Sequence, residues 1–130
     1  MIVADSDVLI DALRGQEPSR RRIELELRSG QLATTCVNAF ELLSGGRRER
    51  ERKAVDQLLG ALVIFPFDEA AARVAAEIRL ALEAKGLGIG MADYLIAGVC
   101  LARSATLLTR NRAHFERVPG ITLAPLTPTR

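Results

Sequence analysis

Three carboxylates stand out in this sequence because each of them interrupts an apolar stretch: Asp5, Glu41 and Asp93. Removing an ionised carboxylate from water is costly, so acids in such surroundings serve either a local structural purpose or chemistry. If the three side chains met in one place, protonation or a bound cation would have to relieve their repulsion. Oxygen-only ligands suit Mg²⁺ or Mn²⁺. Such ions can activate a water molecule and stabilise the leaving oxygen of a phosphodiester.

Each acid also has a structural interpretation. Asp5 directly follows an apolar run and could cap the helix that comes next. Asn38 and Glu41 stand three residues apart, the spacing of a capping box. Asp93, near the start of an apolar helix, could interact favourably with the helix dipole. Asp7, a fourth acid beside Asp5, is expected on a solvated helix position. Taken singly these interpretations compete with chemistry, but the three acids together favour a metal site.

The remaining reactive residues exclude several other kinds of site. His114 is the only histidine, and Cys36 and Cys100 lie far apart in apolar runs. Without a CxxC motif or a His–Cys cluster, a structural zinc site is excluded. A Ser–His–Asp or Cys–His mechanism would have to be built on that single imidazole. We expect the two thiols to be buried as small apolar groups, and His114 to have a surface or loop-packing role.

Length and composition indicate one globular domain over residues 1–130. Apolar residues make up 48% of the chain and charged residues 26%, with a net charge of +2, which argues against disorder. No secretory signal is recognised, because acids interrupt the apolar segment at the N-terminus. The apolar runs are shorter than the roughly 20 residues that span a bilayer. These features predict a cytoplasmic protein without a membrane segment.

Hydrophobic patterns predict strands that alternate with helices. Strands are expected over residues 2–4, 32–37, 62–67, 106–109 and 121–126. Helices are expected over residues 6–14, 18–29, 38–44, 47–59, 68–85, 91–103 and 112–116. This alternation indicates right-handed crossovers and a parallel sheet that is covered on both faces. Ligands of such sheets bind beyond the carboxyl ends of the strands, where Asp5 is expected.

Four segments resemble PIN-domain ribonucleases of the VapC toxin type. Residues 3–10, with the sequence Asp-Ser-Asp, resemble the opening strand and turn of that family, and residues 37–43 resemble the segment that carries its second acid. Residues 89–97 resemble the segment of the third acid, and residues 108–115 contain the Thr-Arg-Asn motif. The order and spacing of these segments span nearly the whole chain, which makes the combination more specific than any one of them.

The resemblance implies a three-layer α/β/α sandwich with a central parallel sheet of four to five strands. It also implies RNA cleavage that depends on Mg²⁺ or Mn²⁺. Asp5, Glu41 and Asp93 map onto the metal-site acids of the family, with Asp5 and Asp93 as the direct ligands. Supporting polar positions are assigned to Ser6, Asp7 and Thr109.

One departure from the family pattern concerns the fourth acid. Many members carry a carboxylate in or after the Thr-x-Asn motif, whereas this chain has the neutral Asn111 there and His114 downstream. Asn111 is included among the catalytic candidates, because its carbonyl could bind a metal ion or orient a metal-bound water. The substitution leaves open whether one ion or two are used.

The resemblance also implies partners: an RNA substrate, a VapB-type antitoxin whose C-terminal segment occupies the active-site groove, and a second copy in a homodimer. Arginines cluster at residues 20–22 and 47–53. These clusters could be solvated helix faces, or could contact RNA phosphates or the acids of a partner. Aromatic residues make up only 4% of the chain, so a structured RNA loop is favoured over a single strand stacked on many aromatics.

Two other functions remain as alternatives to a toxin endoribonuclease. A catalytically inactive PIN-like binding module is compatible with the neutral Asn111. A receiver-like signalling domain has a similar size and also binds Mg²⁺ through acids at strand ends. That class needs a lysine at the end of its last strand, and the only lysines here, Lys53 and Lys85, fall in predicted helices.

Overall fold

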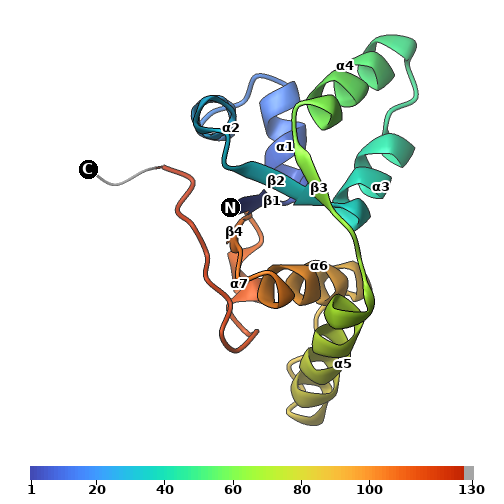
Figure 1. The fold of residues 1–130 in the computed structure, drawn as a ribbon, viewed down its shortest axis with the longest axis vertical. Coiled ribbons are helices and arrows are strands. Elements are labelled where there is room, and N and C mark those ends of the chain that lie inside the picture. The colour runs from blue at the N-terminus through green and yellow to red at the C-terminus, as the bar shows by residue number, and fades with distance from the viewer. Residues whose placement is uncertain (128–130) are drawn as a thin grey trace.

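A parallel sheet of four short strands forms the centre of the protein, which is described here by a computed structural model for residues 1–127. The strands are β1 (Ile2–Ala4), β2 (Leu32–Thr35), β3 (Val63–Phe65) and β4 (Thr106–Leu108). Their order is β3-β2-β1-β4 (Figure 1). Strand β1 is central, with Ile2 in register with both Leu32 and Thr106. The predicted parallel α/β sheet is therefore confirmed.

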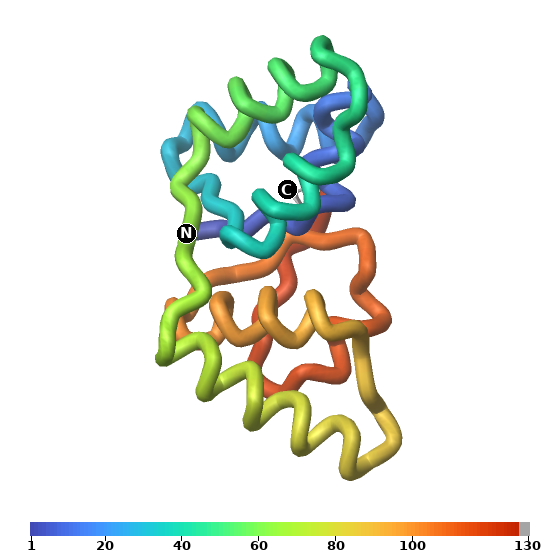
Figure 2. Tube along the Cα trace, turned by 90° about the vertical axis from the view of Figure 1, so that its right-hand side faces the viewer, coloured from blue at the N-terminus to red at the C-terminus, as the bar shows by residue number. Residues whose placement is uncertain are grey.

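Seven helices are described: α1 (Ser6–Leu13), α2 (Ser19–Ser29), α3 (Cys36–Gly45), α4 (Glu49–Gly60), α5 (Glu69–Ala84), α6 (Met91–Ala102) and α7 (Arg112–Phe115). Helices α1, α2 and α4 lie on one side of the sheet, and α5 and α6 lie on the other (Figure 1). The view turned by 90° shows the same separation, with the sheet between the two groups (Figure 2). This is the expected α/β/α sandwich.

Two apolar cores result from the alternation of side chains along β1. Val3 belongs to the core beneath α5 and α6, whereas the next residue, Ala4, belongs to the core beneath α1 and α2. Both residues are fully buried, as expected for the central strand of a sheet that is covered on both faces. Helix α6 is buried along most of its length, which explains why its sequence is apolar all round.

Helices α5 and α6 approach each other closely at Gly98. A Cβ atom at this position would lie 2.6 Å from the carbonyl oxygen of Ala71 and 2.7 Å from the Cβ atom of Ala75. The small residues on α5 and α6 therefore permit the contact between the two helices. Asp68 caps α5, because its side chain accepts a hydrogen bond of 2.9 Å from the backbone N–H of Ala71.

The strand predicted over residues 121–126 is wrong. One isolated bridge joins Leu107 to Leu123, with the Leu107 N–H donating to the Thr122 carbonyl and the Ala124 N–H donating to the Leu107 carbonyl, both at 2.8 Å. The Ala124 carbonyl, which would accept the next hydrogen bond of a parallel ladder, instead accepts one of 3.1 Å from the Arg112 side chain. The described sheet therefore has four strands.

The second predicted strand is shorter than expected, and the predicted capping box is wrong. Strand β2 ends at Thr35 because that residue caps α3, and Thr35 and Asn38 form the capping box. The box therefore begins three residues earlier than the Asn38–Glu41 pair that the spacing suggested. As a consequence, the Glu41 side chain is free for another contact.

The two cysteines are free thiols. Cys100 is fully buried, as expected for a thiol that packs as a small apolar group. Burial raises the pKa of this thiol to about 12. Cys36 is half-buried, and its sulfur accepts a hydrogen bond from the Phe67 N–H at 3.2 Å. Within residues 1–127, no helix combines the length and the apolar character needed to cross a membrane.

Candidate active site

The site lies beyond the carboxyl ends of β1, β2 and β4. Asp5 directly follows β1, and Thr109 directly follows β4. The Asp5 N–H donates to the Leu108 carbonyl at 2.8 Å, which extends the pairing of the two strands by one residue. Because the strands are parallel, these positions meet at one edge of the sheet, where parallel sheets bind their ligands.

Asp5 is the centre of this site. Its Oδ1 accepts hydrogen bonds from the Ser6 N–H at 2.8 Å and from the Asn38 amide at 3.0 Å. Its Oδ2 accepts a hydrogen bond of 2.7 Å from the Thr109 hydroxyl. Asp5 also caps helix α1, so the structural interpretation is correct. The same carboxylate is nevertheless tied to two other segments of the chain and is buried with them.

Glu41 joins the site through Ser6. The Ser6 hydroxyl donates to Glu41 Oε1 at 2.7 Å and accepts from the Asn38 amide at 2.9 Å. Asn38 is fully buried and contacts both Ser6 and Asp5. The sequence pattern indicates Asn38 only as part of a capping box and does not reveal this contact. Its position three residues after the strand-ending Thr35 is the signal that could have identified it.

Asp93 lies in the first turn of α6 and reaches the same site from the other side. Its Oδ2 is 3.2 Å from Nδ1 of His114, and that nitrogen is 3.0 Å from the Asn111 amide. The Asn111 N–H donates to the Thr109 hydroxyl at 3.0 Å. A single ring nitrogen cannot accept from the amide and donate to Asp93 at once, so the tautomer selects between the two bonds. The chain of contacts from Asp93 back to Asp5 is continuous.

Two residues make contacts that the sequence did not predict. His114, expected on the surface or packed in a loop, is half-exposed, and its ring also contacts Asp93 and Asn111. Asp7 was expected in solvent, but it is half-buried, and its Oδ2 accepts a hydrogen bond of 3.1 Å from the Arg110 N–H. Asp7 Oδ1 is buried without a hydrogen-bond partner.

Burial determines the charge behaviour of the site. The pKa of Asp5 is raised from 3.8 to about 6, mainly by burial and also by the negative charges of Asp7 and Asp93, against the hydrogen bonds from Thr109 and Ser6. Burial likewise raises the pKa of Asp7. Arg110 partly offsets the charge of Asp7, but neither Asp5 nor Asp93 is paired with a lysine or arginine among residues 1–127, so a positive ion would be bound favourably.

The donor set can be compared with what a metal ion needs. Among residues 1–127, no three or more His, Cys, Asp or Glu side chains gather closely enough to enclose an ion. Mg²⁺ does not require such a cage, because it usually binds one or two carboxylates and retains several waters. Asp5 and Asp93 face each other closely enough to interact electrostatically, and Asp7 Oδ1 has no other partner. This all-oxygen set fits a hard divalent cation.

Comparison with known proteins agrees with the geometry. The family model described as "PIN domain" matches residues 2–121. Ribonuclease VapC10 of Mycobacterium tuberculosis is 37% identical over 115 residues, which cover 88% of this chain and 86% of that protein. The tRNA(fMet)-specific endonuclease VapC of Salmonella typhimurium is 28% identical over 121 residues, covering 90% of this chain and 91% of the relative.

A solved structure shows the same fold. The structure of VapBC2 from Rickettsia felis, bound to a DNA fragment from its promoter, includes a chain that matches with a TM-score of 0.86 and 29% identity. The match covers 95% of this chain and 98% of the other. With the family model and a curated relative above 30% identity, the chain belongs to the PIN-domain family, among the VapC ribonucleases.

Proposed function

We propose that this protein is an endoribonuclease that depends on Mg²⁺ or Mn²⁺ and acts as the toxin of a toxin–antitoxin pair. Family membership makes it a ribonuclease. The observation that supports metal dependence is that the buried Asp5 and the half-buried Asp93 lie close enough to interact electrostatically, while neither is paired with a lysine or arginine among residues 1–127. A bound divalent ion would supply an activated water and would stabilise the charge that develops on the phosphodiester.

Each residue of the site has a distinct role in this proposal. Asp5 and Asp93 would bind the ion directly. Glu41 adds its carboxylate to the site next to Ser6, from which it accepts a hydrogen bond. Thr109 fixes the orientation of the Asp5 carboxylate through its 2.7 Å hydrogen bond. Carboxylates held in this way are already in place before substrate arrives, which reduces the reorganisation needed during the reaction.

Asn111 and Asp7 have supporting roles. Asn111 donates to the Thr109 hydroxyl and contacts His114 beside Asp93, so it connects the two acids that hold the ion. It is neutral, and it therefore adds no charge to attract a second ion. Asp7 lies next to Asp5 and contributes negative charge to the site. This arrangement favours one tightly bound ion.

The partners proposed here follow from the relatives. The matched VapBC2 structure is a complex bound to promoter DNA, and we propose that this chain is likewise held inactive by a VapB-type antitoxin. We also propose a homodimer, a cytoplasmic location and a single domain over residues 1–130. One relative is named for cleavage of tRNA(fMet), and a structured RNA loop of that kind is the proposed substrate class.

The test is cleavage of a mixed cellular RNA pool by the purified chain, free of antitoxin, with Mn²⁺, with Mg²⁺ and with EDTA. We expect discrete fragments that disappear in EDTA and in the Asp93→Asn and Asp5→Asn variants. The matched control is Asp56→Asn, which removes an exposed acid of α4 and should cleave like the parent. End-mapping of the fragments would give the target.

A folded sample that cleaves no RNA with any metal would contradict the proposal. That result would favour the second candidate, a catalytically inactive binding module, for which the neutral Asn111 is the specific observation. Asn111→Asp would then be the first variant to make, because it restores an acid to the site. The receiver-like alternative has lost its support, since Lys53 lies within α4 and Lys85 caps α5.

A further inference from the structure

Residues 109–111 connect β4 to α7 and carry contacts to both of the proposed metal-binding acids. The Thr109 hydroxyl donates to Asp5. The Asn111 amide contacts the imidazole that lies beside Asp93. These three residues belong to neither a helix nor a strand, so no regular hydrogen-bond ladder fixes their backbone. The orientation of the two acids therefore depends on how this connection is attached to the rest of the protein.

Arg110, the middle residue of the connection, binds α1 at two points. Its backbone N–H donates to Asp7 Oδ2 at 3.1 Å, and its Nη1 donates to Asp11 Oδ2 at 2.6 Å. Asp7 and Asp11 are four residues apart, so they lie on one face of α1 and about 6 Å apart along its axis. The backbone and the side chain of one residue are therefore fixed to two successive turns of the same helix.

The ion pair between Arg110 and Asp11 joins segments that lie 99 residues apart along the chain. Most other ion pairs among residues 1–127 join residues three or four positions apart, as Arg73 and Glu69 do on α5. The side chain of Asp11 is only 13% exposed, against 82% for Glu69. A charge-assisted hydrogen bond is stronger where water is largely excluded, so this ion pair can fix the connection against α1.

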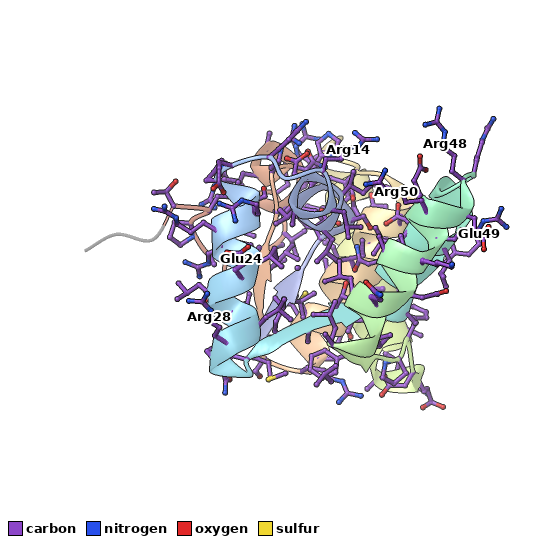
Figure 3. All side chains as sticks on the ribbon, turned by 90° about the horizontal axis from the view of Figure 1, so that it is seen from above. Arg14, Glu24, Arg28, Arg48, Glu49 and Arg50 are labelled. Carbon is purple, nitrogen blue, oxygen red and sulfur yellow. The ribbon has the colours of Figure 1, made fainter. Side chains whose placement is uncertain are left out.

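Two arginines elsewhere illustrate the difference. Figure 3 shows Arg28 on the outer side of α2 and Arg48 beside the start of α4. Both are exposed, and charges of this kind interact mainly with solvent and are screened by salt. Arg110 instead connects two elements that meet at the site.

We propose that Arg110 and Asp11 are positioning residues of the ribonuclease site, an inference that rests on the proposed function. Neither side chain makes a hydrogen bond to Asp5 or Asp93. Their ion pair fixes residues 109–111 against α1, and this connection in turn orients the two acids toward a divalent ion. Removing a residue that orients metal-binding groups typically weakens metal binding by about 10–100-fold.

The main experiment measures Mn²⁺ affinity by isothermal titration calorimetry for the parent, Arg110→Gln, Asp11→Asn and the double variant. Asp93→Asn, which removes a proposed ligand, identifies the binding that belongs to this site. If charge alone mattered, losing the cation Arg110 would strengthen Mn²⁺ binding, losing the anion Asp11 would weaken it, and the two effects would sum in the double variant. We expect instead that each single change weakens Mn²⁺ binding by about tenfold. The double variant should bind no more weakly than either single variant, because both changes remove the same interaction.

Two further variants separate positioning from folding. Arg110→Lys keeps the charge but lacks the planar guanidinium, so its Mn²⁺ affinity should lie between those of the parent and Arg110→Gln. Arg73→Gln is the matched control, because it removes an ion pair of 3.1 Å that lies within α5, and it should bind Mn²⁺ like the parent. Ion pairs that are partly exposed add little to stability, so thermal unfolding should show that every variant is folded during the titration.

RNA cleavage provides a second readout. At low Mn²⁺ concentration, Arg110→Gln and Asp11→Asn should cleave more slowly than the parent. Raising the Mn²⁺ concentration should restore part of the rate, because the acids that bind the ion are still present and only their orientation is less well fixed. The Asp93→Asn variant should show no such recovery.

The inference is overturned if Arg110→Gln binds Mn²⁺ as tightly as the parent or more tightly. It is also overturned if the double variant changes the binding free energy by the sum of the two single effects. If Arg110→Gln keeps the Mn²⁺ affinity of the parent but binds RNA more weakly and with a lower salt slope, Arg110 contacts an RNA phosphate instead. Parent protein that binds Mn²⁺ and cleaves RNA in these cases leaves the proposed function intact, whereas parent protein that binds no Mn²⁺ contradicts both.

Discussion

Asp5 should destabilise the folded protein at neutral pH when no metal is bound. Its pKa is raised from 3.8 to about 6 by burial and by neighbouring acids. The folded state therefore binds more protons than the unfolded state between these values, and stability falls as the pH rises from about 4 to about 6. At 1.36 kcal/mol per pKa unit, the loss is about 3 kcal/mol and is complete above about pH 7.

Asp5→Asn removes the charge and nearly preserves the shape. The amide oxygen can still accept from the Ser6 N–H and the Asn38 amide, whereas the bond from Thr109 must be rearranged. Rearranging one buried hydrogen bond costs about 1 kcal/mol. We therefore expect Asp5→Asn to raise the free energy of unfolding by about 2 kcal/mol near pH 8 in EDTA. The variant should have no activity.

The assay is urea denaturation in EDTA near pH 4 and near pH 8, with Asp56→Asn as the exposed control. Near pH 4, Asp5 is protonated in the folded parent, so the variant should no longer have a higher free energy of unfolding than the parent. Adding Mn²⁺ near pH 8 should stabilise the parent but not Asp5→Asn, because ligand binding stabilises the folded state only where a site exists. An Asp5→Asn protein less stable than the parent near pH 8 would refute the reasoning, as would a stability difference independent of pH.

The remaining predictions concern packing and positioning. Gly98→Ala should lower the free energy of unfolding by about 1–3 kcal/mol, because its Cβ atom would clash with the Ala71 carbonyl at 2.6 Å. Gly60→Ala, which meets no atom within 4 Å, should show no such loss in the same thermal unfolding assay. His114→Ala should lower kcat for RNA cleavage, and His114→Asn should restore part of it by keeping a nitrogen near Asp93. Equal kcat values for the two His114 variants would exclude this positioning role.

The alternation of strands and helices was predictable from the sequence because it is determined locally. Short apolar runs are bounded by glycine, proline or a capping residue, and the long helix α5 begins after Asp68 as its cap requires. The strand predicted over residues 121–126 does not form, because an apolar pattern does not reveal how many strand partners are available. The tail makes one bridge with Leu107, and the next carbonyl, that of Ala124, accepts a hydrogen bond from the Arg112 side chain, a contact that the apolar pattern does not reveal.

The site was only partly predictable. Asp5 was identified because a carboxylate directly after a buried strand lies at the end where parallel sheets bind ligands. Asn38 and His114 were not identified as site residues, because their contacts join segments far apart along the chain. Asn38 reaches Asp5 across 33 residues, and His114 reaches Asp93 across 21. Such contacts depend on the order of the strands and on the docking of α6, which residue spacing alone does not encode.

The structural and chemical interpretations of Asp5 are not alternatives, because one carboxylate performs both roles. A residue needed only to cap α1 could be serine or asparagine, which cap helices about as well as aspartate and carry no charge. An aspartate chosen for capping alone would also be better placed in solvent, with an ordinary pKa. Asp5 is instead buried beside Asp7 and Asp93, which makes its ionised form unfavourable. The cap and Thr109 fix the carboxylate in an orientation, and its unfavourable charge becomes favourable when a divalent cation is bound there.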